Sequence, residues 1–289
     1  MTFSILIAAY HAAPTLQRAL NSVAAQTCAD WELIVVEDGS EDGTEQIVEA
    51  FARDKSQPVR YKRHEKNLGV FATRTQLIEL ARGDALAFLD ADDHWLPTHL
   101  SDLAICLEQG HSLVCSGVTW WDGNLDRRMH DFIPSEKYLT NPRQSLFEMS
   151  FIQTSSCVAL PRAVAKSTGS FDATLHIGED RDYWFRALEG GGTLGCTGAF
   201  TCRYTKQDGS AMTQTLKVAS DTVHFYEKHL LTSDIKPSLA RAKLVGALRT
   251  YGRLLQKTEP YSARRIFMRA WKLAPWSVDL PLRAIICKL

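Results

Sequence analysis

The sequence predicts an α/β protein with a doubly wound, mainly parallel sheet and a helical C-terminal extension. First, short apolar runs alternate with amphipathic segments up to about residue 118, a pattern typical of strands joined by helical crossovers. Second, runs such as Phe3 to Ala8 are apolar throughout, as in strands buried on both faces. Third, from about Thr213 apolar residues recur at helical spacing to the end of the chain.

Each element follows from a local pattern. Largely apolar runs predict strands at 3–8, 31–36, 85–89, 113–118, 157–160, 193–196 and 200–204, and a further strand is expected at 59–63, after the break at Pro58. Apolar residues at helical spacing predict helices after Pro14 to about residue 26, around 47–51, at 71–80 with Gly83 as the stop, at 97–108, at 161–168 and from about residue 179 to the glycines at 190 and 191. Residues 120–150 are aromatic and mixed in charge, so we expect a loop-rich segment beside the crevice.

Composition excludes several classes of protein. A chain of 289 residues with 45% hydrophobic and 23% charged residues can form one large core plus an appendage. Seven cysteines without a CxxC pair indicate reduced core residues rather than a disulfide framework or a zinc site. The first apolar run is too short for a membrane span and no basic leader precedes it, so a cytoplasmic location is expected. Neither GxGxxG nor GxxxxGK[ST] occurs, which argues against dinucleotide and P-loop sites.

The net charge of zero hides a basic tail. Residues 228–289 carry 13 Lys and Arg against 3 Asp and Glu, whereas residues 1–227 carry 20 against 30. In the tail the cations interleave with apolar residues, which predicts basic amphipathic helices. These helices either pack on the preceding domain with solvated basic faces, or bind an anionic membrane surface.

The strongest chemical signal is the stretch FLDADDHW, where an apolar strand ends in Asp90, Asp92 and Asp93. Carboxylates at the carboxyl edge of a parallel sheet are hard oxygen ligands, suited to Mg²⁺ or Mn²⁺. A simpler interpretation is that Asp93 caps the helix beginning near Pro97. Capping needs only one Asp, so it leaves the other two unexplained.

Two further acidic pairs lie next to predicted elements. Glu37 and Asp38 end the second strand, so they are expected at the same edge of the sheet as the FLDADDHW carboxylates. Glu179 and Asp180 begin a later helix, where acidic residues also favour the helix dipole without any catalytic role. Later, the segment RYTKQDGSAMT offers a polar loop that could close over phosphates.

Five segments, in this order, resemble the motifs of the inverting glycosyltransferase family two, which has the GT-A fold. They are SILIAAYHAAPTLQRALNSVAAQT, WELIVVEDGSEDGT, NLGVFATRTQLIELARGD, FLDADDHW and GEDRDYWFRAL, and they cover roughly residues 3–210. The resemblance implies a GT-A catalytic domain at 1–210, with a nucleotide-sugar-binding half at 1–119 and an acceptor-binding half at 120–210. Residues 211–289 are then the basic helical extension.

The resemblance also implies roles for individual residues. Ala8 and Tyr10 would line the nucleobase pocket, Asp38 would bond the base or ribose, and Arg74 would support the nucleotide. The remaining assignments concern the carboxylates: Asp92 and Asp93 would reach the ribose and the divalent metal, Mg²⁺ or Mn²⁺, and Asp180 would be the general base, with the adjacent Glu179 as the competing candidate.

The implied reaction is metal-assisted, inverting transfer of a sugar from a nucleotide-diphosphate sugar, expected to be a UDP-sugar, to a hydroxyl of a glycan or lipid-linked glycan. No nucleic-acid partner is expected. One alternative is a sugar-1-phosphate nucleotidyltransferase, but such proteins begin with a glycine-rich phosphate loop where this chain has AAYHAAP. The other alternative is a non-catalytic nucleotide-sugar-binding protein, against which the complete set of carboxylates argues.

Overall fold

The computed structural model describes residues 1–206, 215–277 and 279–287. The chain divides into two compact units, one made of Met1–Ala173 and Glu179–Asp208, the other of Thr174–Gly178 and Gly209–Leu289. The boundary expected at residue 210 lies within residues 207–214, outside the described part of the chain.

Four neighbouring parallel strands form one half of the sheet in the first unit. Strands β1 (Phe3–Ala9), β2 (Trp31–Glu37), β3 (Val59–Arg63) and β4 (Ala85–Phe88) lie in the order β3-β2-β1-β4. In this register Ile5 lies beside Leu33 and Ala87. Apart from Ser4, β1 is apolar, and its burial explains this sequence, since Phe3, Ile5 and Ile7 have no exposed surface.

The other half of the sheet contains antiparallel pairings. Strand β8 (Val158–Pro161) lies between β4 and β6 (Leu113–Asp122) and is antiparallel to both. Strand β6 and its parallel neighbour β9 (Leu194–Lys206) therefore run in the same direction as β4. Two further strands, β5 (His94–Trp95) and β7 (Arg127–Phe132), pair antiparallel with β9 and β6. The result is the predicted α/β architecture with a mainly parallel sheet.

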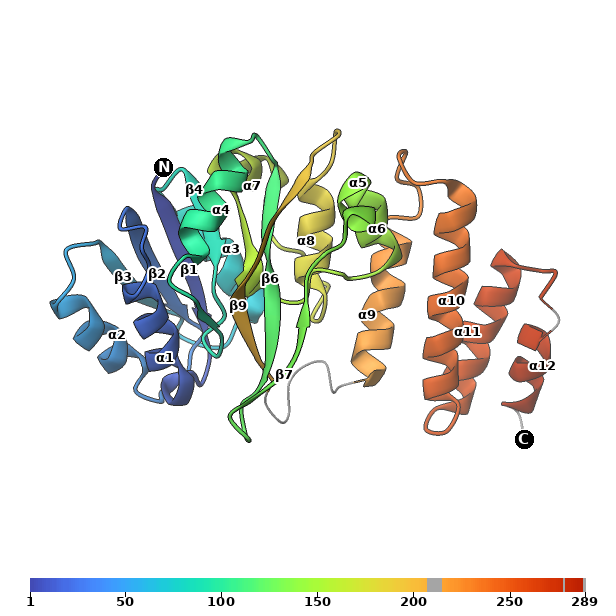
Figure 1. Ribbon diagram of the computed structural model, residues 1–289. Coiled ribbons are helices and arrows are strands. Elements are labelled where there is room, and N and C mark those ends of the chain that lie inside the picture. Colours follow the sequence, from blue (N-terminus) through green and yellow to red (C-terminus); the bar gives the residue numbers. More distant parts are fainter. Residues whose placement is uncertain (207–214, 278, 288–289) are drawn as a thin grey trace. The chain divides into compact units, whose positions relative to one another are not determined.

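Helices cover both faces of this sheet. They are α1 (Ala13–Ala24), α2 (Thr44–Arg53), α3 (Val70–Leu80), α4 (His99–Glu108), α5 (Glu136–Thr140), α6 (Pro142–Glu148), α7 (Arg162–Thr168) and α8 (Glu179–Ala187). In Figure 1, α1 and α4 lie in front of the strands and α3 behind them. The doubly wound arrangement is therefore confirmed.

Three local expectations were wrong. Residues 120–150 are not mainly loop, because β6 continues to Asp122 and is followed by β7, α5 and α6. The two strands expected at 193–196 and 200–204 form one strand, β9, which keeps pairing with β6 through a register shift near Gly117. Finally, Asp93 does not cap a helix, since α4 begins at His99 with Thr98 as its N-cap residue.

Gly83 has a different role from the expected helix stop, since α3 ends at Leu80 with Ala81 as its C-cap residue. Its amide donates to the Ser4 hydroxyl, and a Cβ on Gly83 would lie 2.7 Å from the Ser4 nitrogen. The glycine therefore lets the chain pass against the backbone of β1.

The second unit contains four helices among the described residues. These are α9 (Thr215–Lys228), α10 (Pro237–Leu255), α11 (Pro260–Leu273) and α12 (Asp279–Ile286), and α10 contacts both α9 and α11. Pro237 and Pro260 each occupy the first turn of a helix, where a missing N–H costs nothing. Within the described residues, no helix is both long and apolar enough to cross a membrane.

The buried His99 predicts an acid-sensitive first unit. Its ring is fully buried, stacks on Trp95 and bonds to the Thr201 hydroxyl at 2.8 Å, and burial lowers its pKa to about 3. The unfolded chain takes up this proton below about pH 6.5 and the folded chain does not, so stability falls as pH drops from 6.5 toward 3.

Between pH 6.5 and pH 5 the loss from His99 alone should be about 2 kcal/mol of unfolding free energy. We expect His99→Asn to remove this component in urea unfolding at the two pH values, whereas His130→Asn, at an exposed position, should retain it. An unchanged acid loss in His99→Asn would show that other groups cause it.

Candidate functional site

The candidate site lies at the edge of the sheet where β1, β2 and β4 end. Because these strands are parallel neighbours, the segments that follow them meet at one edge. Tyr10, Asp38 and Asp90 are the first charged or aromatic groups after the three strands. The residues predicted from separate motifs are thus brought to the same edge of the sheet.

A cavity at this edge contains three of the predicted residues. Ala8, Tyr10 and Asp38 line a space of about 170 Å³ together with four residues of the segment after β3, Asn67, Gly69, Val70 and Thr73, and with Ala9. The Tyr10 side chain is 52% exposed, whereas Asp38 is buried. An exposed aromatic ring beside a buried carboxylate offers both a stacking surface and a hydrogen-bonding group.

The Asp38 carboxylate organises the loop that borders this cavity. It accepts hydrogen bonds from the Leu68 and Gly69 amides, both at 2.8 Å, and lies 2.7 Å from His64 Nδ1. Gly39, with a φ of +72°, allows close approach, because a Cβ there would lie 2.4 Å from the Lys66 carbonyl carbon. Asp38 therefore fixes the loop.

Asp93 is turned into the protein. It has no exposed surface, and its carboxylate accepts hydrogen bonds from the Ser156 hydroxyl (2.6 Å), the Thr154 hydroxyl (3.0 Å) and the Thr205 amide (2.8 Å). Burial, followed by repulsion from Asp92 and Asp90, raises its pKa well above the ordinary value. These three contacts connect the turn after β4 with the segment before β8 and with β9.

Asp92 has the opposite environment. It is half-buried, and its carboxylate accepts no hydrogen bond from any other residue in the described part of the chain. Its backbone carbonyl accepts instead from Arg18, which also donates to the Thr205 hydroxyl at 3.0 Å. Burial and the neighbouring charge of Asp90 raise the Asp92 pKa to about 6, although the positive charge of Arg18 opposes the shift.

The residues present fit a divalent cation that arrives with a phosphorylated ligand. Within residues 1–206, 215–277 and 279–287, no three His, Cys, Asp or Glu side chains converge to hold a metal on their own. Mg²⁺, however, commonly takes one or two carboxylates and completes its shell with phosphate oxygens and water. Asp92 offers one such carboxylate. The partly exposed Asp90 offers a second, although its oxygens also accept from Arg74 (2.8 Å) and Thr154 (3.4 Å), whereas the Asp93 oxygens are fully buried and accept three protein hydrogen bonds.

Arg74 connects the turn after β4 to the second acidic pair. Its buried guanidinium donates to Asp90 at 2.8 Å and to Glu179 at 2.6 Å. Burial disfavours the charge of Arg74, but Asp90 and Glu179 outweigh this effect and raise its pKa. Arg74 therefore holds the start of α8 beside the turn that follows β4.

Glu179 and Asp180 differ in their contacts. Glu179 is buried against Arg74, and burial raises its pKa to about 7 although Arg74 opposes the shift. Asp180 is half-buried, and one of its oxygens accepts the Arg181 amide at 2.6 Å. Burial also raises the pKa of Asp180, with Arg74 again opposing. Asp180 is thus the more accessible of the two carboxylates.

Several residues of the site were not predicted from the sequence. The Thr154 and Ser156 hydroxyls donate hydrogen bonds to Asp93, and the Ser156 hydroxyl also accepts a hydrogen bond from the Asp90 amide at 2.9 Å. The available signal was the polar run QTSS directly before an apolar strand. Arg18 carried no signal, because an arginine on a helix is common.

The expected phosphate loop is only partly described. Its Arg203 lies over the Trp121 ring at 4.9 Å, whereas Ser210 lies outside the described residues.

Comparison with known proteins identifies the family. The model of glycosyl transferase family 2 matches residues 4–169. The putative teichuronic acid biosynthesis glycosyltransferase TuaG of Bacillus subtilis is 24% identical over 78% of this chain and 87% of its own length. The Escherichia coli UDP-Glc:alpha-D-GlcNAc-diphosphoundecaprenol beta-1,3-glucosyltransferase WfgD is 34% identical over 34% of this chain and 37% of its own.

A solved structure shares the fold. The crystal structure of residues 1–349 of S. aureus TarS in complex with UDP-GlcNAc matches with a TM-score of 0.70 and 18% identity, covering 100% of this chain and 87% of that one. The chain spans about a third of the length of the first curated relatives it matches. The match to the family model covers more than half of the sequence and agrees with the five motifs, the GT-A fold and the carboxylate edge, so the chain belongs to glycosyl transferase family 2.

Proposed function

We propose that this protein is an inverting glycosyltransferase that moves a sugar from a nucleotide-diphosphate sugar, a UDP-sugar, to a hydroxyl acceptor. The observation that carries the proposal is the connection of two groups of carboxylates by Arg74, one at the end of β4 and one at the start of α8. Family membership and the UDP compounds in the names of WfgD and the TarS complex support the donor class.

Donor recognition is assigned to the edge of β1 and β2. Ala8 and Tyr10 would contact the nucleobase, with Tyr10 supplying an exposed ring for stacking. Asp38 would contact the base or ribose, although its oxygens already hold the 68–69 amides, so part of its contribution is to position that loop. Arg74 would support the nucleotide indirectly by fixing Asp90.

The metal, Mg²⁺ or Mn²⁺, is assigned to Asp92 with help from Asp90. When bound, a divalent cation stabilises the negative charge of the leaving diphosphate without proton transfer. The family resemblance implies Asp93 as a metal ligand as well, but binding a cation through Asp93 would break its hydrogen bonds to Ser156 and Thr205. We therefore assign Asp93 to positioning the turn.

The general base is assigned to Asp180. The acceptor hydroxyl must lose its proton as it attacks the anomeric carbon, and a nearby carboxylate can take that proton. A raised pKa makes a carboxylate a stronger base, and this favours both Asp180 and Glu179. The ion pair between Glu179 and Arg74 leaves Asp180 as the better placed group. Direct displacement without a covalent intermediate would invert the configuration.

The acceptor is proposed to be a glycan or a lipid-linked glycan. Relatives are named for teichuronic acid biosynthesis and for transfer to a diphosphoundecaprenol-linked sugar. No observation comparable to the family match or to the carboxylates connected by Arg74 favours a nucleotidyltransferase or a non-catalytic protein. The following experiment also tests the non-catalytic alternative.

We expect Asp180→Asn to release UDP from its UDP-sugar donor about 10²- to 10⁴-fold more slowly, because an amide cannot accept the hydroxyl proton. UDP affinity, measured by calorimetry with Mn²⁺, should be unchanged. The donor for this assay is first selected by screening a panel of UDP-sugars for thermal stabilisation.

Glu179→Gln is the matched variant, since it makes the same chemical change one position earlier. It should slow release less than Asp180→Asn does. The reverse result, with Asp180→Asn active and Glu179→Gln inactive, would move the base to Glu179. Wild-type protein that binds every UDP-sugar without releasing UDP would instead support the non-catalytic alternative.

We also propose that the second unit attaches to an anionic membrane surface. Tyr261, 79% exposed, lines a cavity along α11 together with Arg264, Arg265, Met268, Arg269 and Lys272. Trp276, 72% exposed, follows α11. Cations beside exposed aromatic rings are the composition of an interfacial helix.

Each Lys or Arg near an anionic leaflet contributes about 1 kcal/mol, so replacing Arg264 and Arg265 by Ala should weaken liposome binding about 30-fold. The measurement is flotation with phosphatidylserine-containing vesicles at low salt. Binding should be lost at 1 M salt, where the Debye length is about 3 Å. The control replaces the exposed Arg53 and Lys62 of the first unit by Ala and should bind as wild type. Equal binding by both double variants would refute attachment through α11.

A further inference from the structure

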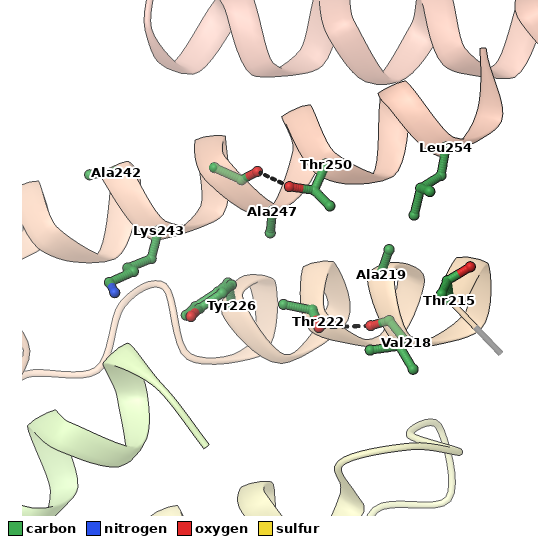
Figure 2. Close-up of a pocket in the computed structure, with 11 residues that line it drawn as sticks. Thr215, Val218, Ala219, Thr222, Tyr226, Ala242, Lys243, Ala247, Thr250 and Leu254 are labelled. Atoms are coloured by element: carbon green, nitrogen blue, oxygen red, sulfur yellow. Dashed lines mark hydrogen bonds between the residues drawn. The ribbon is translucent and has the colours of Figure 1, made fainter. Parts of the chain in front are cut away.

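The second unit contains a cavity of about 690 Å³ between α9 and α10. Its walls are mainly apolar and include Val218, Ala219, Tyr226, Gly246, Ala247 and Leu254. Figure 2 shows Ala219 of α9 directed toward α10, and Ala247 and Leu254 of α10 directed toward α9. The volume falls within the range of roughly 300–1,000 Å³ typical of small-molecule sites. The donor site proposed above does not use this cavity.

Small residues leave the cavity open, and hydroxyls that are already hydrogen-bonded make its walls apolar. Gly246 and Ala247 on α10 keep side-chain volume low opposite Ala219 on α9. The Thr222 and Thr250 hydroxyls donate to carbonyls of their own helices, at 2.7 and 3.2 Å. Both hydroxyls are therefore already bonded, and the cavity suits an apolar ligand rather than a polar one.

The shape of the cavity suits a chain with a charged end. The α10 wall runs from Ala242 to Leu254, a rise of about 18 Å along the helix axis. Lys243 lies toward one end of the cavity in Figure 2, and Thr215 and Leu254 lie toward the other. Among the described residues that line the cavity, Lys243 is the one charged side chain. An extended apolar chain with an anionic headgroup matches both its length and its charge.

We propose that this cavity binds the isoprenoid chain of a polyprenyl-phosphate-linked acceptor, with Lys243 near the phosphate. This inference rests on the proposed function and specifies its acceptor class. A folded partner protein fits less well, because the cavity lies between two packed helices rather than across a flat apolar surface. The proposal gives the basic helical unit a role in selecting the acceptor.

Gly246 allows a matched test. A Cβ at this position would meet no atom within 4 Å, so larger side chains can enter the cavity without a clash at Cβ. Gly246→Ala and Gly246→Phe both remove a helical glycine, but only phenylalanine fills the space. Farnesyl diphosphate is the probe, and isopentenyl diphosphate carries the same headgroup with almost no chain.

Binding is measured by calorimetry on the full chain with saturating UDP and Mg²⁺, so that the diphosphate probes do not enter the donor site. Wild type and Gly246→Ala should bind farnesyl diphosphate equally. Gly246→Phe should weaken binding about tenfold or more, since losing burial of two methylene groups is enough for that change. Isopentenyl diphosphate should bind far more weakly to all three proteins.

A charge variant provides an independent measurement should Gly246→Phe fail to fold. Lys243→Ala should weaken farnesyl diphosphate binding severalfold, whereas Arg253→Ala, an exposed position on the same helix outside the cavity wall, should not. Equal affinities of wild type, Gly246→Phe and Lys243→Ala, or equal binding of the two diphosphates, would overturn the proposal. UDP binding is titrated separately, so failure of the donor assignment would appear there.

Discussion

The site depends on the burial of one carboxylate, Asp93. Burying a polar group is costly unless its hydrogen-bonding atoms find partners, and here the Ser156 and Thr154 hydroxyls and the Thr205 amide bond to the Asp93 oxygens. These partners come from two other segments of the chain, so their bonds hold the turn after β4 in one position. Asp92, the adjacent residue, is thereby kept half-buried, with no hydrogen bond to its carboxylate from another described residue. The accessible position of Asp92 and the buried position of Asp93 are two consequences of one constraint.

A second buried interaction extends this order to α8. Arg74 contacts both Asp90 and Glu179, so the turn after β4 and the start of α8 share one guanidinium. Removing a partner from such a buried network leaves an unpaired charge and costs several kcal/mol in typical proteins. Loss of activity on replacing Arg74 would therefore reflect misplaced neighbours as much as lost nucleotide contact. Variants that conserve shape, such as Asp180→Asn, are more informative about chemistry.

Much of the fold could be predicted because burial leaves a direct pattern in the sequence. Strand β4 is wholly apolar and β1 and β2 are largely so, and prolines mark the starts of α10 and α11. The pairing of β6 with β7 was missed because β7 begins with exposed, mostly charged residues and so lacks the apolar pattern of a strand. The sequence also placed Asp90, Asp92 and Asp93 together, but it could not show which one turns inward. That choice depends on Ser156 and Thr205, which are distant along the chain and become neighbours only after folding.

The most direct test of the account is a crystal structure with UDP and Mn²⁺, in which anomalous scattering locates the ion. The account predicts Mn²⁺ at about 2.2 Å from an Asp92 oxygen and bound to the diphosphate, with Asp93 still bonded to Ser156 and Thr205. An ion bound by Asp93, with those hydrogen bonds broken, would contradict the division of roles between the two residues. UDP bound away from the edge formed by β1, β2 and β4 would contradict the site itself.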